Sequence, residues 1–259
     1  MKVFILCGGY GTRLDNLGRV IAKPMAYIGK EPILMHIIKN FCIQGFNDFV
    51  LCTGHKNLSI NNYFLYKNKN NLKIFSKTKN KIFFKYKKKN LNFNCNIIYT
   101  GKNSGTGGRI KIAYKKLNLS EDIIMTYGDG LSNVNIKKLL KFHKDNSALV
   151  TLTAVKPKIR YGFIKIKNKK INYFDNTNQK KTDVYINGGF FIISNNAIKR
   201  IKNNQVYWEK EPLESLISNK KLFAFKHHGF WQSVDTLKDL NDLNDQLKTK
   251  KILWQFNGK

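Results

Sequence analysis

The start of the chain constrains its fold more than any other stretch, because a short apolar strand runs directly into a glycine-rich loop. Val3 to Cys7 are apolar and rich in strand-forming residues, and the loop Gly8-Gly9-Tyr10-Gly11-Thr12-Arg13 follows at once. Glycines give the backbone access to positive φ and let its N–H groups approach a ligand with no Cβ in the way. Such a loop suits a phosphate, but an ordinary turn between a strand and a helix fits the same residues, and this stretch alone leaves both interpretations open.

Two basic residues near the loop favour the phosphate interpretation. Arg13 offers a planar fork of donors that matches phosphate oxygens, and Lys23, beside Pro24, offers a second positive charge. The spacing is neither that of the Walker loop nor that of the dinucleotide-binding loop. The sequence therefore predicts a phosphate site of another kind.

The segments after the loop predict a parallel sheet. Residues 32–41 carry apolar side chains at helical spacing, and residues 48–54 form an apolar run that ends in glycine. A strand, a helix and a second strand in this order form a βαβ unit of an α/β domain. Ligands bind such sheets at the carboxyl ends of the strands, where the glycine loop lies.

The composition is strongly basic, with a formal net charge of +31. A charge of this size ordinarily indicates nucleic acid or an anionic membrane as partner. Here lysine supplies nearly all of it, and the other abundant residues, asparagine, isoleucine, phenylalanine and tyrosine, also have A/T-rich codons. We therefore expect neither a nucleic-acid nor a membrane partner, and nonspecific nucleic-acid binding with a steep salt dependence stays as an alternative.

The chain carries no pattern typical of export or of a membrane span, so we expect a cytoplasmic protein. Its four cysteines are scattered without a C-x-x-C pair, which predicts small core residues and neither disulfides nor a zinc site. The pair His227-His228 has no partner cluster, so we expect it to be incidental.

A second glycine-rich turn, Ser104-Gly105-Thr106-Gly107-Gly108-Arg109, follows the strand predicted over 96–101 and opens a helix. Its glycines give a ligand access to the backbone, its hydroxyls donate hydrogen bonds, and Arg109 adds a fixed cation.

Two further segments contain residues suited to binding a metal ion or a sugar. A buried strand brings Asp129, between Gly128 and Gly130, to the sheet edge, where it suits magnesium or caps a turn. Asn187, before two glycines, offers a donor and an acceptor to sugar hydroxyls.

These segments together resemble the sugar-1-phosphate nucleotidyltransferases. The opening G-G-x-G-T-R-L followed by K-P-M is typical of that family, and T-G-G-R at 106–109, Y-G-D-G at 127–130 and G-F-W-Q-x-x-D-T at 229–236 resemble its glucose-1-phosphate cytidylyltransferase branch. The resemblance implies one α/β domain over 1–259, Rossmann-like, with a mixed, mainly parallel central sheet flanked by helices and a peripheral β-hairpin insertion. It also implies transfer from CTP to glucose 1-phosphate, giving CDP-glucose for surface polysaccharides such as the O-antigen of lipopolysaccharide.

The resemblance also assigns roles to residues. Arg13 and Lys23 are expected to be catalytic, and Mg²⁺ is expected on Asp129 and Asp235. The nucleotide is expected to contact Leu6, Gly8, Gly9, Tyr10, Gly11, Thr12, Arg13, Ser104, Thr106, Gly107, Arg109 and Gly128, and the sugar phosphate is expected to contact Lys23, Tyr161, Gly162, Lys180, Asn187 and Gly188.

The chain departs from the family at two places. Tyr99 stands where the family usually has aspartate, and residues 174–181 lack the family's E-K-P, so that Lys180 is the nearest substitute for its lysine. Two alternatives therefore remain: an enzyme of the same fold for another nucleotide or sugar 1-phosphate, and a nucleotide-binding homologue that has lost transfer.

Residues 66–96 are rich in lysine, asparagine and aromatic residues. The pattern allows a platform for single-stranded nucleic acid, but exposed strands of a peripheral hairpin explain it more simply. The resemblance implies that this insertion makes subunit contacts in a homo-oligomer, which is a hexamer in the family. Two helices are predicted near the end of the chain: one opened by Trp208-Glu209-Lys210-Glu211-Pro212-Leu213, and an amphipathic closing helix from Leu237 to Leu247. The acidic residues at the start of the first helix complement its dipole, and a contact to the sugar, which the family's W-E-x-E-P-L implies, is an equally good interpretation.

Overall fold

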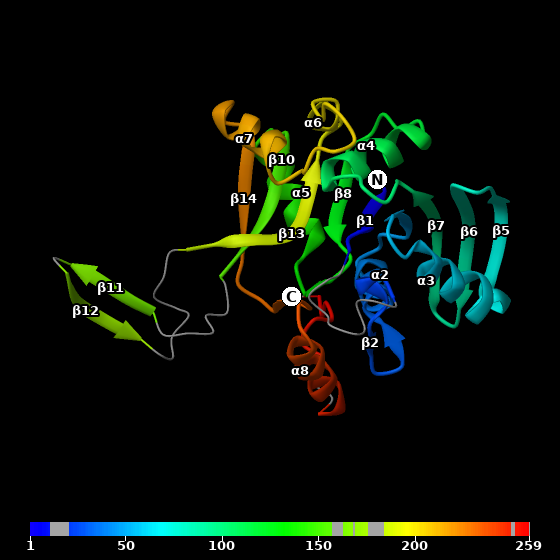
Figure 1. Cartoon of the computed structure of the whole chain (residues 1–259), viewed down its shortest axis with the longest axis horizontal. Helices are drawn as coiled ribbons and strands as arrows, with labels where there is room; N and C mark the ends of the chain where they lie inside the picture. Colours follow the sequence, from blue (N-terminus) through cyan, green and yellow to red (C-terminus); the bar gives the residue numbers. More distant parts are fainter. Residues whose placement is uncertain (11–20, 157–162, 168, 176–183, 250–251, 259) are drawn as a thin grey trace.

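A nine-stranded β-sheet runs through the centre of the protein (Figure 1). The structure is a computed structural model and describes residues 1–10, 21–156, 163–167, 169–175, 184–249 and 252–258. The strand order is β14-β10-β13-β8-β1-β4-β7-β6-β5, and β8, β1, β4 and β7 are mutually parallel. Only β13 and β6 run against the other strands of this sheet, so the prediction of a mixed, mainly parallel sheet flanked by helices is confirmed.

The described strands are β1 (Val3–Cys7), β2 (Tyr27–Ile28), β3 (Glu31–Pro32), β4 (Asp48–Thr53), β5 (Leu72–Lys77), β6 (Lys81–Lys88), β7 (Leu91–Tyr99), β8 (Ile123–Tyr127), β9 (Gly130–Ser132), β10 (Val150–Val155), β11 (Phe163–Lys167), β12 (Lys170–Asp175), β13 (Ile186–Ile193), β14 (Leu222–His227) and β15 (Trp231–Ser233). The α-helices are α2 (Ile33–Ile43), α3 (Asn57–Asn62), α4 (Thr106–Lys116), α5 (Ile136–Asp145), α6 (Asn195–Ile198), α7 (Glu211–Ser218) and α8 (Leu237–Lys248). Three short turns of other helix types are η1 (Lys23–Met25), η2 (Tyr63–Lys67) and η3 (Lys69–Asn71). None of the described helices is long and apolar enough to cross a membrane.

The sheet separates two hydrophobic clusters, and strand β1 contributes to both. Val3, Ile5 and Cys7 belong to one cluster with α2 and α8, whereas Phe4 and Leu6 belong to the other with α4. Successive side chains of a strand point to opposite faces, so a strand that is apolar throughout must be covered on both sides. All five residues of β1 are buried, which explains its continuous apolar run.

The helices predicted from apolar spacing are present. The predicted helix 32–41 is α2, with Pro32 just before its first residue, and the helix predicted after the second glycine-rich turn is α4. The closing amphipathic helix is α8, which buries Leu240 and Leu243 in the larger cluster.

The insertion 66–96 contains the predicted hairpin, but the hairpin is continuous with the central sheet. Strand β6 pairs with β7 along its whole length, and β5 then forms the outer edge of the sheet. Alternate side chains of β6, including Phe84 and Tyr86, are buried against Phe64 of η2. Phe84 and Tyr86 of β6 are therefore core residues, whereas Phe83 is only partly buried and β5 is largely exposed.

A second hairpin, formed by β11 and β12, extends from the body of the protein at the end of the sheet opposite β5 (Figure 1).

Candidate active site

A cavity of about 1090 Å³ lies at the carboxyl ends of the parallel strands, where the two glycine-rich turns meet. The predicted residues that line it are Leu6, Gly8, Gly9, Tyr10, Lys23, Ser104, Thr106, Arg109, Gly128, Asp129 and Asp235. They come from segments far apart in the sequence, and the sheet brings them together because its parallel strands end at one edge.

Some predicted residues lie elsewhere. Gly107 is buried below the cavity wall, and Asn187 and Gly188 lie beside the wall on β13 rather than in it. The predicted residues Gly11, Thr12, Arg13, Tyr161, Gly162 and Lys180 lie outside the described part of the chain.

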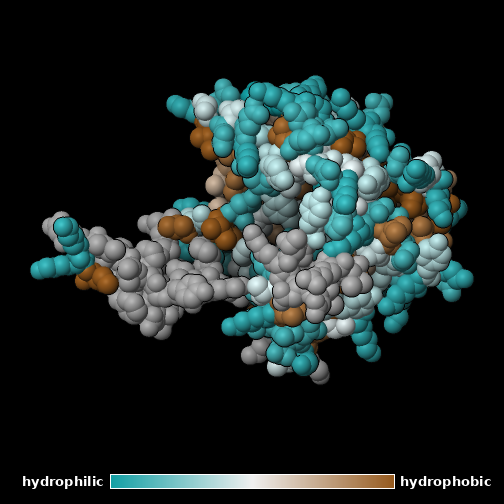
Figure 2. Space-filling model, in the orientation of Figure 1, coloured by the Kyte–Doolittle hydropathy of each residue, from teal (hydrophilic) through white to brown (hydrophobic). Residues whose placement is uncertain are grey.

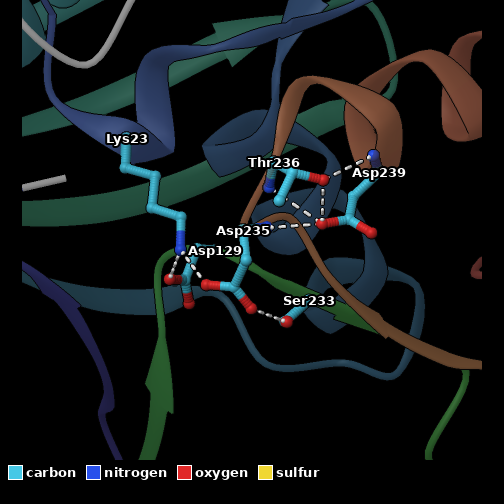
Figure 3. Close-up of polar contacts among 6 residues, drawn as sticks. All are labelled: Lys23, Asp129, Ser233, Asp235, Thr236 and Asp239. Carbon is cyan, nitrogen blue, oxygen red and sulfur yellow. Dashed lines mark hydrogen bonds and ion pairs between the residues drawn. The ribbon is translucent and has the colours of Figure 1, made fainter. Parts of the chain in front are cut away.

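Lys23 lies between two aspartates in this cavity (Figure 3). Its Nζ is 2.6 Å from Oδ2 of Asp129 and 2.7 Å from Oδ1 of Asp235. Asp129 connects β8 to β9, and Asp235 follows β15. Strands β9 and β15 pair antiparallel with Gly130 opposite Ser233, and this short pairing sets the two carboxylates side by side.

Glycine is required just before Asp129. A Cβ on Gly128 would lie 2.6 Å from Cγ of Pro24 and 3.0 Å from the carbonyl oxygen of Leu6. The Lys23-Pro24 segment therefore packs directly on the turn that carries Asp129. This contact explains why glycine is found at position 128, where a larger residue would collide with Pro24.

The ammonium of Lys23 is largely shielded from solvent, since its side chain is only 14% exposed, whereas the side chains of Asp129 and Asp235 are 30% and 36% exposed. Burial opposes the charge of Lys23, but the two carboxylates outweigh burial and raise the pKa of Lys23 above its usual 10.5. The second oxygen of Asp235 accepts a hydrogen bond from Ser233. Lys23 is thus held as a cation at the cavity wall.

The two carboxylates suit a magnesium ion. The ammonium of Lys23 shows that one cation contacts both carboxylates at once. Within the described residues there is no cluster of three or more histidine, cysteine, aspartate or glutamate side chains able to hold a metal. Magnesium usually binds through one or two carboxylates together with substrate phosphates and water, so two carboxylates beside a phosphate site match its needs.

A capping box fixes the segment that carries Asp235. The Oδ2 of Asp239 accepts hydrogen bonds from the backbone N–H of Thr236 at 2.8 Å and of Asp235 at 3.1 Å, and Thr236 Oγ1 accepts from the N–H of Asp239 (Figure 3). The start of helix α8 therefore orients Asp235.

Replacing Thr236 with alanine should destabilise the protein by about 1 kcal/mol, because the first turn of α8 loses its cap. In a chain of this size that loss corresponds to roughly 2 to 4 °C in Tm. Differential scanning calorimetry measures it, and Thr236→Ser, which keeps the hydroxyl, should retain most of the stability. Equal Tm values for wild type and Thr236→Ala would contradict a stabilising cap.

The glycines of the second turn serve close packing between protein segments. A Cβ on Gly105 would lie 2.3 Å from the carbonyl oxygen of Val206, and a Cβ on Gly108 would lie 1.8 Å from that of Asn204. The N–H groups of both glycines donate to the same stretch, Asn204 to Val206. This contact also places Tyr207 and Glu209 on the cavity wall.

Tyr127 and Glu209 line the cavity but were not among the predicted site residues, although they bond to Asn187 and Thr106, which were. Glu209 accepts hydrogen bonds from the hydroxyls of Tyr127 and Thr106, and Asn187 Nδ2 donates to Tyr127 Oη at 3.4 Å. Burial, followed by the charge of Glu209, raises the pKa of Tyr127, so its hydroxyl remains a donor. The motif at 208–213 was the available signal for Glu209, but it predicted a helix start as readily as a site residue.

Comparison with known proteins gives a consistent result. A family model described as nucleotidyl transferase matches residues 2–250. The chain is 37% identical over 259 residues to the glucose-1-phosphate cytidylyltransferase of Salmonella typhimurium, covering 98% of this chain and 99% of the relative. It is 32% identical over 257 residues to a probable glucose-1-phosphate cytidylyltransferase of Bacillus subtilis, with the same coverage. A solved structure of UDP-glucose pyrophosphorylase complexed with UDP-glucose superposes with a TM-score of 0.67 at 17% identity, over 96% of this chain and 98% of the other.

Proposed function

The chain belongs to the nucleotidyl transferase family, and from this premise we propose that it joins CTP and α-D-glucose 1-phosphate to give CDP-glucose and pyrophosphate. The observation that carries the proposal is the convergence of Lys23, Asp129 and Asp235 on the wall of a cavity that the glycine loop also lines. The choice of CTP and glucose 1-phosphate is supported by the names of the relatives that match nearly the full length of the chain.

The proposed reaction needs no nucleophile from the protein. A phosphate oxygen of the sugar phosphate attacks the α-phosphorus of CTP, a new P–O bond forms, and the bond to the β-phosphate oxygen breaks to release pyrophosphate. The attacking group is already ionised, so catalysis consists of positioning the substrates and neutralising the charge that accumulates between them.

The residues of the cavity divide this work. Asp129 and Asp235 would hold magnesium, which supplies positive charge to the phosphates when it is bound. Lys23 donates to phosphate oxygens from the adjoining wall, and Gly8 to Tyr10 and Ser104 frame the nucleotide. Tyr127 and Glu209 on the wall, with Asn187 beside it on β13, offer hydrogen-bonding groups to sugar hydroxyls. Arg13, Tyr161, Gly162 and Lys180 keep their predicted phosphate and sugar roles as part of the proposal.

Pyrophosphate release tests the function directly. Purified protein is incubated with magnesium, glucose 1-phosphate and, in turn, CTP, UTP, GTP, ATP and dTTP. Release with CTP alone supports the proposal, and release with another nucleotide replaces it by the same chemistry on a different base. If CTP binds without release, the chain is a nucleotide-binding homologue that has lost transfer, and the changed segment 174–181 is the first place to restore the family's lysine.

We further propose a cytoplasmic setting, where CTP is available, and use of the CDP-glucose for deoxysugars of surface polysaccharides such as the O-antigen. Both follow from the resemblance of the chain to the cytidylyltransferases. Cell fractionation tests the first, and loss of CDP-glucose from extracts of a deletion strain tests the second.

We propose that a second copy of the chain covers the edge strand β5. Ile74 and Phe75 of this strand are 46% and 51% exposed, and Phe75 stacks on Phe83 with ring centroids 5.1 Å apart. Figure 2 shows hydrophobic side chains gathered toward the side of the molecule where β5 and β6 lie. Exposed apolar side chains on an unpaired edge strand favour association between chains.

The variant Phe75→Lys should therefore lower the oligomeric state, because it places a charge in the proposed interface. Analytical ultracentrifugation measures the mass in solution. Ile217→Lys is the matched control, since Ile217 is an equally apolar side chain, 63% exposed, on the distant helix α7. An unchanged mass for Phe75→Lys, or an equal loss in both variants, would contradict this interface.

A further inference from the structure

Arg109 extends from α4 to the wall of the cavity, and only 4% of it is exposed. Its Nη2 donates to the carbonyl oxygens of Gly8 at 2.8 Å and Lys102 at 3.2 Å. Its Nη1 donates to the carbonyl oxygens of Gly101 at 2.7 Å and Thr53 at 3.3 Å, and to Thr100 Oγ1 at 2.9 Å. Thr53 ends β4, and the other acceptors directly follow β1 and β7, so one guanidinium connects the carboxyl ends of three adjacent parallel strands.

Two glycines leave the space that the guanidinium occupies. A Cβ on Gly8 would lie 2.3 Å from Cζ of Arg109, and a Cβ on Gly54 would lie 2.2 Å from its Nη1. Gly8 is therefore needed where the first loop meets Arg109, in addition to any contact that the loop makes with a ligand. Gly8 and Gly54 precede Arg109 by 101 and 55 residues in the sequence, and the fold brings all three together.

The bonds to Arg109 determine where the neighbouring N–H groups point. In a planar trans peptide the C=O and the following N–H point in opposite directions. Because the carbonyls of Gly8, Gly101 and Lys102 face the guanidinium, the N–H groups of the next residues face away from it. Those next residues are Gly9, Lys102 and Asn103, and all three line the cavity, from two different loops. Among the described residues, none of these three N–H groups has a hydrogen-bond partner.

The acceptors of Arg109 are all neutral. In the described part of the chain its hydrogen bonds go to carbonyl and hydroxyl oxygens, and burial lowers its pKa. Arginine nevertheless stays protonated in proteins, so Arg109 is a cation at the cavity wall whose described partners are all neutral. Because the N–H donors of the guanidinium bind protein oxygens, Arg109 acts on a ligand through its charge and through the loops that it holds in place.

We propose that Arg109 is a positioning residue for the nucleotide. It holds the loops after β1 and β7 so that the N–H groups of Gly9, Lys102 and Asn103 are presented as donors to acceptor oxygens of the nucleotide. That the nucleotide is CTP rests on the function proposed above. The role of Arg109 in holding the loops rests on its hydrogen bonds and is independent of that function. A single ammonium cannot hold five acceptors on three loops, so charge alone does not replace the guanidinium.

The variants Arg109→Lys and Arg109→Met test this role, with Arg200→Met as the control because Arg200 is exposed in the turn after α6 and does not line the cavity. Arg109→Lys keeps the charge but should raise the KM for CTP about tenfold or more, since hydrogen bonds to a charged group are lost. Arg109→Met should behave similarly, and the KM for glucose 1-phosphate should change little in both. A KM for CTP near the wild-type value in Arg109→Lys would overturn the proposal in favour of direct charge recognition.

A second measurement is made without ligand. Amide nitrogen relaxation should show Gly9, Lys102 and Asn103 ordered in the wild type and more mobile in Arg109→Lys, and equal order in both would overturn the proposal. This result stands even if the wild type releases no pyrophosphate from CTP, in which case the proposed function alone fails. If both Arg109 variants fail to fold, Thr100→Val removes one acceptor of the five, and it should still loosen residues 101–103 and raise the KM for CTP by a smaller factor.

Discussion

Replacing Asp129 with asparagine should lower kcat for pyrophosphate release by about a hundredfold or more, the usual cost of removing one electrostatic contact to a transition state. Asparagine keeps the size of the side chain but loses the charge that holds a divalent cation. It also leaves Lys23 with one carboxylate in place of two. Asp235→Asn should have a similar effect, since its carboxylate lies on the same ammonium. Steady-state kinetics with saturating CTP, glucose 1-phosphate and magnesium measure the loss.

The double variant Asp129→Asn/Asp235→Asn shows whether the two carboxylates act on one cation. If they do, the double variant should cost about as much as either single variant, because residues that act as a unit are not additive. Asp145→Asn is the matched control: it also removes an aspartate that pairs with a lysine, but on the exposed face of α5. Unchanged turnover in both single variants would refute the metal assignment, and fully additive losses would indicate two separate roles.

Asp235 was predicted only from the resemblance to the family, whereas Lys23 and Asp129 were predicted from the residues themselves, because each lies beside a residue with an unusual local constraint. Pro24 and Gly128 are these residues, and they pack so closely that a Cβ on Gly128 would lie 2.6 Å from Cγ of Pro24. The burial of β1 and the βαβ unit of β1, α2 and β4 were also predicted, since apolar strands separated by a helix indicate a parallel sheet, whereas the order of the strands in the sheet was not. Local patterns were sufficient wherever a strand delivered a residue directly to the sheet edge.

Other features of the site had no local signal. Arg109 bonds mainly to backbone carbonyls, which every residue carries, so no residue type in the sequence marks its partners. Gly108 is required by the backbone of Asn204, which lies nearly a hundred residues further along the chain. The hairpin of β5 and β6 was predicted from basic residues that alternate with aromatic ones. Its pairing with β7 was not predicted, because the first half of β7, Leu91 to Cys95, has a polar residue at every second position and was not recognised as part of a strand. Contacts of this kind become visible only in three dimensions.

Lys23→Met should have opposite effects on turnover and on metal affinity. Turnover should fall by about a hundredfold, because a cation that neutralises phosphate charge is removed. The ammonium of Lys23, however, lies between Asp129 and Asp235, where a metal would bind (Figure 3). Removing it should therefore raise the affinity for Mn²⁺, which electron paramagnetic resonance measures by the signal of the free ion.

Stability provides the third readout for the same variant. The pKa of Lys23 is raised, so its contribution to stability is fully present below the unfolded value of 10.5 and is lost only as the pH rises through the higher folded value. The Tm of Lys23→Met should accordingly lie below that of the wild type by a constant amount from about pH 6 to about pH 9. Magnesium should restore part of this loss, since it would supply the missing cation. Lys141→Met, which breaks an exposed pair with Asp145, should change neither Tm nor Mn²⁺ affinity appreciably. If Lys23→Met bound Mn²⁺ no better than the wild type, the two aspartates that hold Lys23 would not be the metal ligands.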